Sequence, residues 1–561
     1  MGKKILIAVA LILCFTMAFT GCSTRKKESE SPNSNSTTAV GAKVAPVGTF
    51  PIVKEKQTLR VFCAQDTPVE NYDTNDFTKW YEDKTNIHIQ WEAVQGAYMG
   101  EKLQVKLAAG DFADIYMNSG LSESQIVMYA SQGAFIPINS LIDQYAPNVK
   151  KMFHKVPEAK AMSICPDGNI YGTPRVNESI NESFPKKMWI YKPWLDKLGL
   201  SMPTTVDEFY QVLKAFKTKD PNGNGKADEV PLAGAYGAKY ANNEINGFLM
   251  MPFIYYDRGT NVYLDNGKVT FSADKPEYRE GLKYIRKLFS EGLIAPDSFV
   301  QDRAALQALV ENGPENRLGC VPAFYWGHFA IENGPSGRDK EFVAVPPLKG
   351  PTGLRQAYSR GSQIFSNRIV ISKVCKIPEA AMRWADWFYD NENMLAEGFS
   401  ATIGKEGIGW KKAEEGAVGI DGRPAKYQFL MAPGTLQNNH WNQTVGTYED
   451  QNYIFSVAAG TPSSRKEVFG TSESKEKYLP YASNKVVPKL YLTEEQTGRL
   501  GDIKKSIENM VDTYMVKFVT GTLDLDKDWD AYLRELKIAK ADEYVRVSQD
   551  AYDVYLKNLK K

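Results

Sequence analysis

A run of oxygen-bearing side chains, broken by glycines, stands between residues 220 and 229. Counted from Asp220, side-chain oxygens occur at positions 1, 3, 5 and 9, with a glycine at 6 and a backbone carbonyl at 7, as in the first part of an EF-hand loop. A hard cation takes about six to eight oxygens that converge from a tight coil. The spacing therefore predicts a structural Ca²⁺ site with the ligands Asp220, Asn222, Asn224, Lys226 (through its carbonyl), Asp228 and Glu229.

The end of this loop departs from the EF-hand pattern. Position 12 is Pro231, which cannot bind a metal, so Glu229 at position 10 is expected to supply the closing carboxylate. The loop follows a predicted helix and has no catalytic group beside it, which indicates a structural metal. The alternative is a turn rich in Asn and Gly that binds no metal, which the same sequence also favours.

The sequence contains no recognisable catalytic motif. Its four histidines are far apart, and it has no HExxH pair, glycine-rich phosphate loop, nucleophile elbow or dinucleotide fingerprint. We therefore expect that the protein is not an enzyme. A secreted, wall-associated glycoside hydrolase stays open as the alternative, because its two carboxyl groups need share no motif. Carboxylates close in sequence, each expected on a polar helix face or in a loop, are Asp386/Asp390 and Asp526/Asp528/Asp530.

The N-terminus has the pattern of an export signal. Lys3 and Lys4 precede an almost uninterrupted apolar run over residues 5–19, which is short of the ~20 residues that a helix needs to cross a bilayer core. The sequence Phe19-Thr20-Gly21-Cys22 then predicts cleavage after residue 21 and lipidation of Cys22 by palmitate-type chains. Two acyl chains would hold the protein stably at the extracellular face of the cell membrane. An ordinary secretory peptide with an incidental cysteine is the alternative.

The segment after this cysteine is predicted to be a flexible tether over residues 22–56. Residues 23–49 are rich in Ser, Asn, Thr, Lys and Pro and contain few large apolar side chains, so they cannot bury enough surface to fold.

The mature chain is nearly neutral. Loss of residues 1–21 removes two lysines and no acid, which changes the balance from 68 basic and 67 acidic residues to 66 and 67. A net charge of −1 argues against a nucleic-acid-binding protein.

In the remaining chain, predicted strands and helices alternate, as in an α/β fold. Strands are predicted at 58–63, 87–91 and 114–117 with a helix at 99–109, and a second α/β region begins near 188. Thr205 and Glu208 form a capping box, helices are expected at 276–292 and 378–389, and the chain is nearly all helical from 493. The part of the chain after the tether is longer than a single hydrophobic core usually supports, so we expect two lobes. Four scattered cysteines are expected to be buried, with a disulfide allowed but not required: Cys63, Cys165, Cys320 and Cys375.

Taken in order, several segments make the chain resemble the extracellular solute-binding proteins of carbohydrate ABC importers, in their long lipoprotein branch. These segments are Cys22 with its tether and residues 106–116, 133–138, 194–209, 276–299, 346–351, 378–389, 404–410 and 518–555. The resemblance covers nearly the whole mature chain and implies a two-lobed, periplasmic-binding-protein-like clamp. Each lobe would be a β-sheet flanked by helices, followed by a helical C-terminal part.

The resemblance also implies how the clamp is divided and used. Lobe one would comprise 57–180 and 358–425, and lobe two 181–357 and 426–561, with crossovers near 175–185, 345–362 and 425. The monomeric protein would close on a carbohydrate, most simply an oligosaccharide, and present it to the subunits of an ABC permease. Mono-, oligo- and uronic-acid-containing sugars all stay open, as does a peptide.

A sugar site combines aromatic rings, which stack on C–H patches, with planar polar groups that bind hydroxyls. By family position, lobe one would contribute residues that follow predicted strands, and lobe two would contribute aromatic rings. For every candidate the alternative is core packing or an ordinary surface position. The expected ligand-binding residues are Gln65, Asp66, Asn118 and Ser119 in lobe one, Phe248, Tyr325 and Trp326 in lobe two, Trp441 in the C-terminal part, and Arg175, Arg360 and Trp410 near the crossovers.

Overall fold

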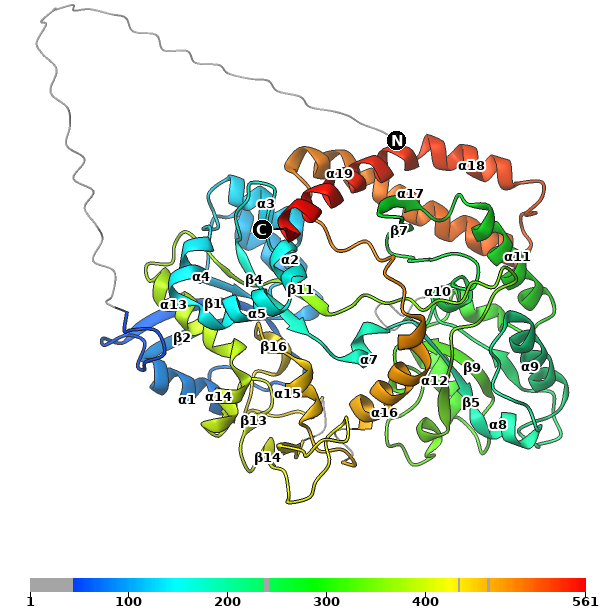
Figure 1. Cartoon of the computed structure of the whole chain (residues 1–561), viewed down its shortest axis with the longest axis horizontal. Coiled ribbons are helices and arrows are strands. Elements are labelled where there is room, and N and C mark those ends of the chain that lie inside the picture. Colours follow the sequence, from blue (N-terminus) through cyan, green and yellow to red (C-terminus); the bar gives the residue numbers. More distant parts are fainter. Residues whose placement is uncertain (1–43, 237–241, 432–433, 462–464, 561) are drawn as a thin grey trace, which may run out of the picture. The chain divides into compact units, whose positions relative to one another are not determined.

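Two β-sheets organise the chain (Figure 1). The computed structural model describes residues 44–236, 242–431, 434–461 and 465–560. Within them, the first sheet has the strand order β16-β4-β11-β3-β1-β2, with β11 antiparallel to both of its neighbours and the other pairs parallel. The strands are β1 (Gln57–Gln65), β2 (Ile87–Gln95), β3 (Ile115–Met117), β4 (Gly172–Asn177), β11 (Gln363–Ile371) and β16 (Tyr448–Glu449).

Both faces of the first sheet are covered by helices. In β1, Val61 and Cys63 face one hydrophobic cluster and Phe62 faces another, as expected for side chains that alternate along a strand. We call this sheet with its helices the first lobe. One face is covered by α1 (Asp76–Thr85), α4 (Asn139–Tyr145), α5 (Pro147–Lys155) and α13 (Pro378–Asp386), and the other by α2 (Met99–Ala108) and α3 (Glu123–Ser131).

The second sheet has the order β10-β5-β9-β6 and, with the helices packed on it, forms the second lobe. The predicted capping box is present: Thr205 Oγ1 accepts from the Glu208 amide, and Glu208 accepts from the Thr205 amide, both at 3.1 Å. The elements are β5 (Lys187–Tyr191), β6 (Val230–Leu232), β9 (Leu318–Ala323) and β10 (Phe342–Val345), the hairpin β7 (Val262–Asp265) and β8 (Lys268–Phe271), and α8 (Lys192–Lys197), α9 (Val206–Thr218), α10 (Asn246–Leu249), α11 (Pro276–Ser290) and α12 (Arg303–Glu311).

The chain crosses between the lobes near the first two expected places and later than expected at the third. Residues 178–186, with α7 (Ile180–Ser183), lead from β4 to β5, and residues 346–362 lead from β10 back to β11. The expected third crossover near 425 is wrong, because β16 pairs with β4 and keeps the chain in the first lobe beyond it. The chain returns to the second lobe at α16 (Arg465–Glu473), where Phe469 lies against Trp189.

Several small elements precede that return to the second lobe. They follow α13 in the sequence, and we count them with the first lobe. They are the 3₁₀ turn η5 (Trp387–Tyr389), α14 (Asn391–Ala396), the hairpins β12 (Phe399–Ser400) with β13 (Gly404–Lys405) and β14 (Trp410–Lys412) with β15 (Tyr427–Phe429), and α15 (Gln451–Phe455).

The C-terminal part is helical, as the sequence predicts, and contacts both lobes. Helices α17 (Glu494–Thr520) and α19 (Ala541–Leu559) touch α11 and β8 of the second lobe, and also α3 and α6 (Pro157–Ala161) of the first. Helix α18 (Trp529–Ile538) lies between them in sequence and packs on both (Figure 1). Before α17, the Tyr491 hydroxyl donates to Asn367 Oδ1 at 2.7 Å, which ties the segment to β11.

The predicted tether is too long at its C-terminal end. Residues 1–43, which include the expected signal peptide and Cys22, lie outside the described residues. Residues 44–56 are packed on the first lobe: Ile52 and Val53 are fully buried, and Arg383 donates to the carbonyls of Ala45 and Thr49. These apolar side chains give this stretch enough buried surface to be ordered.

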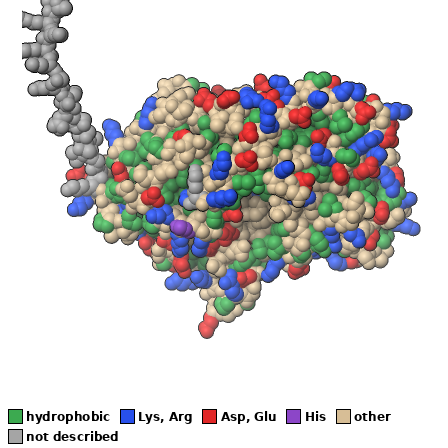
Figure 2. Space-filling model, turned by 45° about the horizontal axis from the view of Figure 1, so that its top comes forward, with side chains coloured by type: hydrophobic (Ala, Val, Ile, Leu, Met, Phe, Trp, Pro, Cys, Tyr) green, Lys and Arg blue, Asp and Glu red, His purple; other side chains and the backbone are tan. Residues whose placement is uncertain are grey.

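The described surface and interior agree with the composition. Figure 2 shows basic and acidic side chains interspersed over the visible face, in keeping with the small net charge. All four cysteines expected in the core are buried. Within the described ranges, no helix combines the length and apolar character that crossing a membrane requires.

Candidate functional site

A cavity of about 400 Å³ lies between segments that pack on the two sheets, and we call it the cleft cavity. One wall comes from β4, β11, β16 and loops between residues 402 and 457 of the first lobe. The other wall comes from α7 and the first turn of α16, the helix that packs on the second lobe. A guest molecule in this cavity would therefore contact both lobes.

A buried ion pair stands in the first-lobe wall. Arg175 Nη2 donates to both carboxylate oxygens of Glu449 at 3.1 Å, and Asn177 donates to the same carboxylate. The side chains of Arg175 and Glu449 are only 6% and 13% exposed. Parallel pairing of β16 with β4 brings the two strands together, so the ion pair also fastens the short strand β16 to the sheet.

The half-buried ring of Phe365 lies near two guanidinium groups. Its centroid is 5.7 Å from Cζ of Arg175 and 4.8 Å from Cζ of Arg368. Burial, followed by the charge of Arg175, lowers the pKa of Arg368 to about 10. The pairing of β11 with β4 shifts register between Phe365 and Ile369, a bulge of the kind that re-aims side chains beside sites. Phe365 is thus an aromatic surface of the cleft cavity.

The opposite wall combines charges and aromatic rings. Lys466 Nζ is 3.5 Å from Glu182 and lies 4.9 Å from the ring centroid of Tyr325. Ser179 donates to Glu467, and burial raises the pKa of this glutamate. The wall therefore offers charged groups backed by a half-buried ring.

A larger cavity of about 1250 Å³ adjoins this one and is called the crossover cavity. It is lined by residues that follow β3, by the crossover segments 358–368 and 482–489, and by the end of α19. Gln363 and Phe365 line both cavities. Side chains of strand β11 thus line both the cleft cavity and the crossover cavity.

Residues 67–395 match the bacterial extracellular solute-binding proteins. This chain belongs to that family. It is 30% identical to the fructooligosaccharide ABC transporter substrate-binding protein FusA of Streptococcus pneumoniae over 526 residues, which are 91% of this chain and 92% of FusA. The family resemblance and the two-lobed fold expected from the sequence are thereby confirmed.

Two solved structures of FusA are similar to this solute-binding protein. One is in complex with kestose and aligns with a TM-score of 0.71 at 28% identity, covering 89% of this chain and 100% of FusA. The other is an EF-hand mutant in complex with fructo-nystose, with a TM-score of 0.72 at 27% identity and coverage of 89% and 100%.

In this solute-binding protein, four of the expected polar residues lie at or beside the two cavities. Arg175 lines the cleft cavity, and Asp66 accepts from Asn442 Nδ2, a lining side chain, at 3.0 Å. Asn118 and Arg360 line the crossover cavity. Two others point elsewhere: Gln65 donates to the Val69 carbonyl within its own loop, and Ser119 is fully buried.

Three of the aromatic residues expected to bind the ligand are buried in the cores of the lobes. Trp326 and Trp441 are fully buried and Phe248 is 4% exposed, all within the lobe cores, and none of them is among the described residues that line the cleft cavity or the crossover cavity. Trp326 packs on Trp189 and Phe469 because the strand β9 leads it straight into the second-lobe core. This burial argues against its expected role as a stacking platform.

Two further expected rings remain near the surface of a cavity. Tyr325 is half-buried and lies beside Lys466 of the cleft cavity. Trp410 is almost fully buried; it lines a separate cavity described below and donates from Nε1 to the Gly404 carbonyl at 2.9 Å. Tyr325 therefore stays a candidate for the cleft cavity and Trp410 does not.

Sequence reasoning missed most of the residues that line the cleft cavity. They come from the crossover strand, from the loop after β15 and from α16, which are far apart in the sequence and follow no short motif. The one usable signal was Phe365, an aromatic residue just after the crossover predicted at 345–362. The missed residues are Asn177, Phe365, His440, Asn442, Gln443, Glu449, Lys466 and Glu467.

Three of the carboxylates considered for hydrolysis have structural partners. Burial raises the pKa of Asp386 to about 7, and its carboxylate accepts from the Val149 amide at 2.8 Å at the start of α5. Asp390 caps α14, and Asp526 is paired with Arg279 at 2.6 Å. None of these three groups lines the cleft cavity, and the relative FusA is a substrate-binding protein.

The predicted calcium loop forms a tight coil. The Asp220 carboxylate accepts from the amides of Gly223 and Gly225 at 2.9 and 3.0 Å, and Asn222 donates to Asp228 at 2.8 Å. Both glycines have positive φ, which only glycine adopts without strain. The expected ligands thus surround one bend of the chain.

Glu229 provides the test of whether this loop suits a cation. Its Oε1 is buried and has no hydrogen-bond partner in the part of the chain that the structure describes. Burial, together with the charges of Asp220 and Asp228, raises its pKa. A divalent cation would satisfy this oxygen and offset the three negative charges, so the residues fit calcium. The carboxylates themselves are not gathered into a closed cluster among the described residues.

Proposed function

We propose that this solute-binding protein captures an oligosaccharide in the cleft cavity and delivers it to an ABC permease. The observation that carries the proposal is the half-buried ring of Phe365, set among polar groups in a cavity that both lobes line. Sugar rings stack their C–H patches on such aromatic faces. Because FusA is named for fructooligosaccharides and was solved with kestose, a short fructooligosaccharide is the first candidate ligand.

The polar lining suits a ligand rich in hydroxyl groups. Asn442 and Gln443 supply planar amide groups on the first-lobe side, and Asp66 lies behind them and accepts from Asn442. Lys466 and Glu467 supply charged groups on the second-lobe side. Each hydroxyl both donates and accepts, so a mixture of acceptors and donors satisfies it better than a uniform charge.

Closure of the lobes would couple capture to delivery. We assign residues 44–178 and 363–457 to the first lobe, and 187–345 with α16 to the second, while the C-terminal helices contact both. A ligand that touches both walls stabilises the closed arrangement, because an equilibrium shifts only through differential binding. The closed form is then the one that the permease subunits recognise.

Calcium and a lipid anchor complete the proposal. Asp220, Asn222, Asn224, the Lys226 carbonyl, Asp228 and Glu229 would hold a structural Ca²⁺, which stabilises the folded loop by binding it and not the unfolded chain. Lipidation of Cys22 would keep the protein at the outer face of the membrane.

The test is calorimetric titration of the mature protein with kestose, followed by chromatography of the sugar. We expect saturable binding at one molecule per chain and the return of intact kestose. Conversion of the sugar to smaller products would support the glycoside hydrolase alternative. A panel of short peptides that binds while kestose and nystose do not would overturn the proposal.

A further inference from the structure

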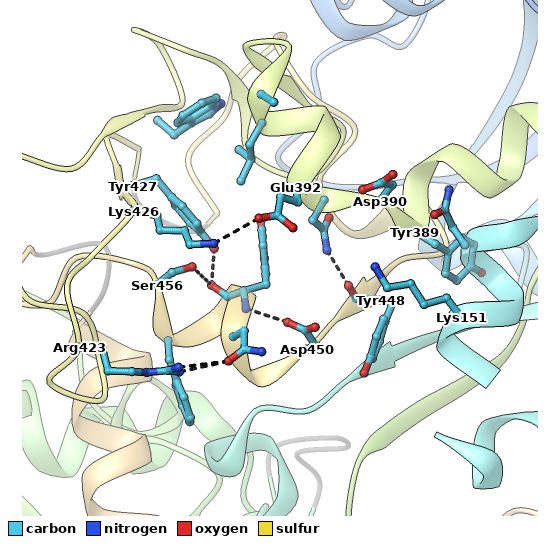
Figure 3. Close-up of a pocket in the computed structure, with 18 of the residues that line it drawn as sticks. Lys151, Tyr389, Asp390, Glu392, Arg423, Lys426, Tyr427, Tyr448, Asp450 and Ser456 are labelled. Atoms are coloured by element: carbon cyan, nitrogen blue, oxygen red, sulfur yellow. Dashed lines mark hydrogen bonds and ion pairs between the residues drawn. The ribbon is translucent and has the colours of Figure 1, made fainter. Parts of the chain in front are cut away.

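We propose that a second cavity, in the first lobe, binds an acidic sugar, that is, one that bears a carboxylate or a phosphate group. This outer cavity has a volume of about 720 Å³, within the range of about 300–1,000 Å³ typical of small-molecule sites. It is lined by α5, η5, α14, β14, β15 and α15 (Figure 3). Its use is independent of the function proposed for the cleft cavity.

The strand β16 contributes side chains to both the outer cavity and the cleft cavity, and Tyr453 of α15 lines both as well. Glu449 lines the cleft cavity, where it pairs with Arg175. Its neighbours Tyr448 and Asp450 line the outer cavity. Successive side chains of a strand point to opposite faces, so one short strand supplies two distinct sites.

Positive charge exceeds negative charge around the outer cavity. Five basic side chains and three carboxylates line it, an excess of two, although the whole chain carries a formal net charge of only +1. Figure 3 shows Lys151, Arg423 and Lys426 reaching the cavity from different segments. The basic residues are Lys151, Lys155, Lys412, Arg423 and Lys426, and the acidic ones are Asp390, Glu392 and Asp450.

The three carboxylates already have partners. Asp450 caps α15 by accepting from the Tyr453 amide at 2.8 Å, and it also pairs with Lys155 at 3.1 Å. Asp390 caps α14. Glu392 is 3.3 Å from Lys426. Arg423 is also engaged, because it pairs with Asp421 at 2.5 Å just outside the lining. Of the five basic groups, Lys151 and Lys412 are therefore the two without an ion pair among the described residues.

Lys151 and Lys412 supply the charge for an incoming anion. Both side chains are exposed, and neither forms an ion pair or hydrogen bond with the described residues. Ammonium groups of this kind form charge-assisted hydrogen bonds with carboxylate or phosphate oxygens. The two lysines come from α5 and β14, so a ligand of some size would be needed to meet both.

The remaining lining favours a sugar over a bare anion. Aromatic rings line the cavity, among them Tyr448, whose ring centroid is 5.6 Å from the Lys155 ammonium. Asn452 accepts from the Arg423 guanidinium at 3.3 Å, and Ser456 adds a hydroxyl group. Rings for C–H patches, together with amide and hydroxyl groups, are what a hydroxyl-rich ligand requires.

The experiment titrates the mature protein with glucuronate and with glucose 6-phosphate, and with glucose, acetate and inorganic phosphate as matched probes. We expect at least one acidic sugar to bind more tightly than glucose and than either simple anion. The better of the two identifies the acidic group. Equal binding of a simple anion, or no preference over glucose, would overturn the proposal.

Charge reversal locates the site. Lys151→Glu and Lys412→Glu should each weaken binding of the acidic sugar by about tenfold or more, the loss of one charge-assisted hydrogen bond together with the new repulsion. Lys537→Glu, an equal charge change on exposed α18, should leave it unchanged. Kestose binding should be unaltered in all three variants, which separates this proposal from that for the cleft cavity. If Lys537→Glu weakens acidic-sugar binding as much as the other two, the outer cavity is not the site.

Discussion

Ten consecutive residues, 220–229, supply every expected ligand of the calcium loop, whereas the cleft cavity takes its lining from segments between Pro68 and Glu467. In the loop, the covalent chain brings the oxygens together, and two glycines with positive φ allow the bend. In the cleft cavity, sheet pairing, crossovers and helix packing bring the side chains together. The loop therefore depends on a local coil and an ion, and the cleft cavity on the whole fold.

The largest effect should follow from breaking a long-range contact of the cleft cavity. Arg175→Ala leaves the buried carboxylate of Glu449 without its cation, so the free energy of unfolding should fall by about 3 kcal/mol. Urea denaturation measures this change. Arg499→Ala removes an exposed ion pair with Glu543 and should leave stability nearly unchanged. Equal losses in the two variants would contradict the structural role of the buried pair.

Removal of calcium should have the next largest effect, and a local one. At 100 times the dissociation constant, a bound ion stabilises the fold by about 2.7 kcal/mol, so EDTA should lower the melting temperature by about 2–3 °C. Glu229→Gln should remove most of this response, whereas kestose affinity should change less than twofold. An EDTA response that is the same in wild type and Glu229→Gln would exclude Glu229 as a ligand.

Loss of the aromatic surface should weaken binding without weakening the fold. Phe365→Ala is expected to reduce kestose affinity about tenfold, because a stacking ring contributes roughly 1 kcal/mol or more beyond its buried area. Tyr210→Ala, which removes a half-buried ring beside the Lys287 ammonium far from the cleft lining, is the matched control. Unchanged affinity in Phe365→Ala, measured by calorimetry, would remove this ring from the site.

The smallest effect should be a loss of stability when the pH is lowered. Burial lowers the pKa of His440 to about 4, and its Nδ1 accepts from the Asn442 amide at 3.0 Å, which requires the neutral ring. Below pH 6.5 the unfolded chain binds a proton that the folded chain does not, so this contribution to stability is present above 6.5 and lost toward 4.

The expected loss is about 1 kcal/mol between pH 6.5 and 5.5. Urea denaturation at the two pH values, in wild type and His440→Asn, isolates this contribution. The fall should be smaller in the variant. A fall of equal size in both proteins would show that other groups cause it.

These two regions also show what a sequence can predict. The tight coil at 220–229 and the capping box at Thr205 were predicted because each depends on residues within one turn or coil, while calcium binding by that coil stays a prediction. Strands β1, β2 and β3 were predicted because apolar residues alternate or cluster along them. The antiparallel place of β11 in the first sheet could not be predicted, because it follows from a return crossover about 190 residues after β4.

The same limit explains the errors in the candidate site. Trp326 ends an apolar run beside glycine, a pattern equally compatible with a stacking platform and with a core position. The packing of Trp189 and Phe469, each more than a hundred residues away in the sequence, shows that the ring is enclosed. Phe365 and Glu449 owe their places to a bulge and to a two-residue strand, which leave no pattern in the sequence.

Small-angle scattering of the mature protein with and without saturating kestose tests the central claim most directly. If the two lobes close on a sugar held between them, the radius of gyration should fall when kestose saturates the protein. An unchanged radius of gyration at a kestose concentration where calorimetry shows full binding would contradict it.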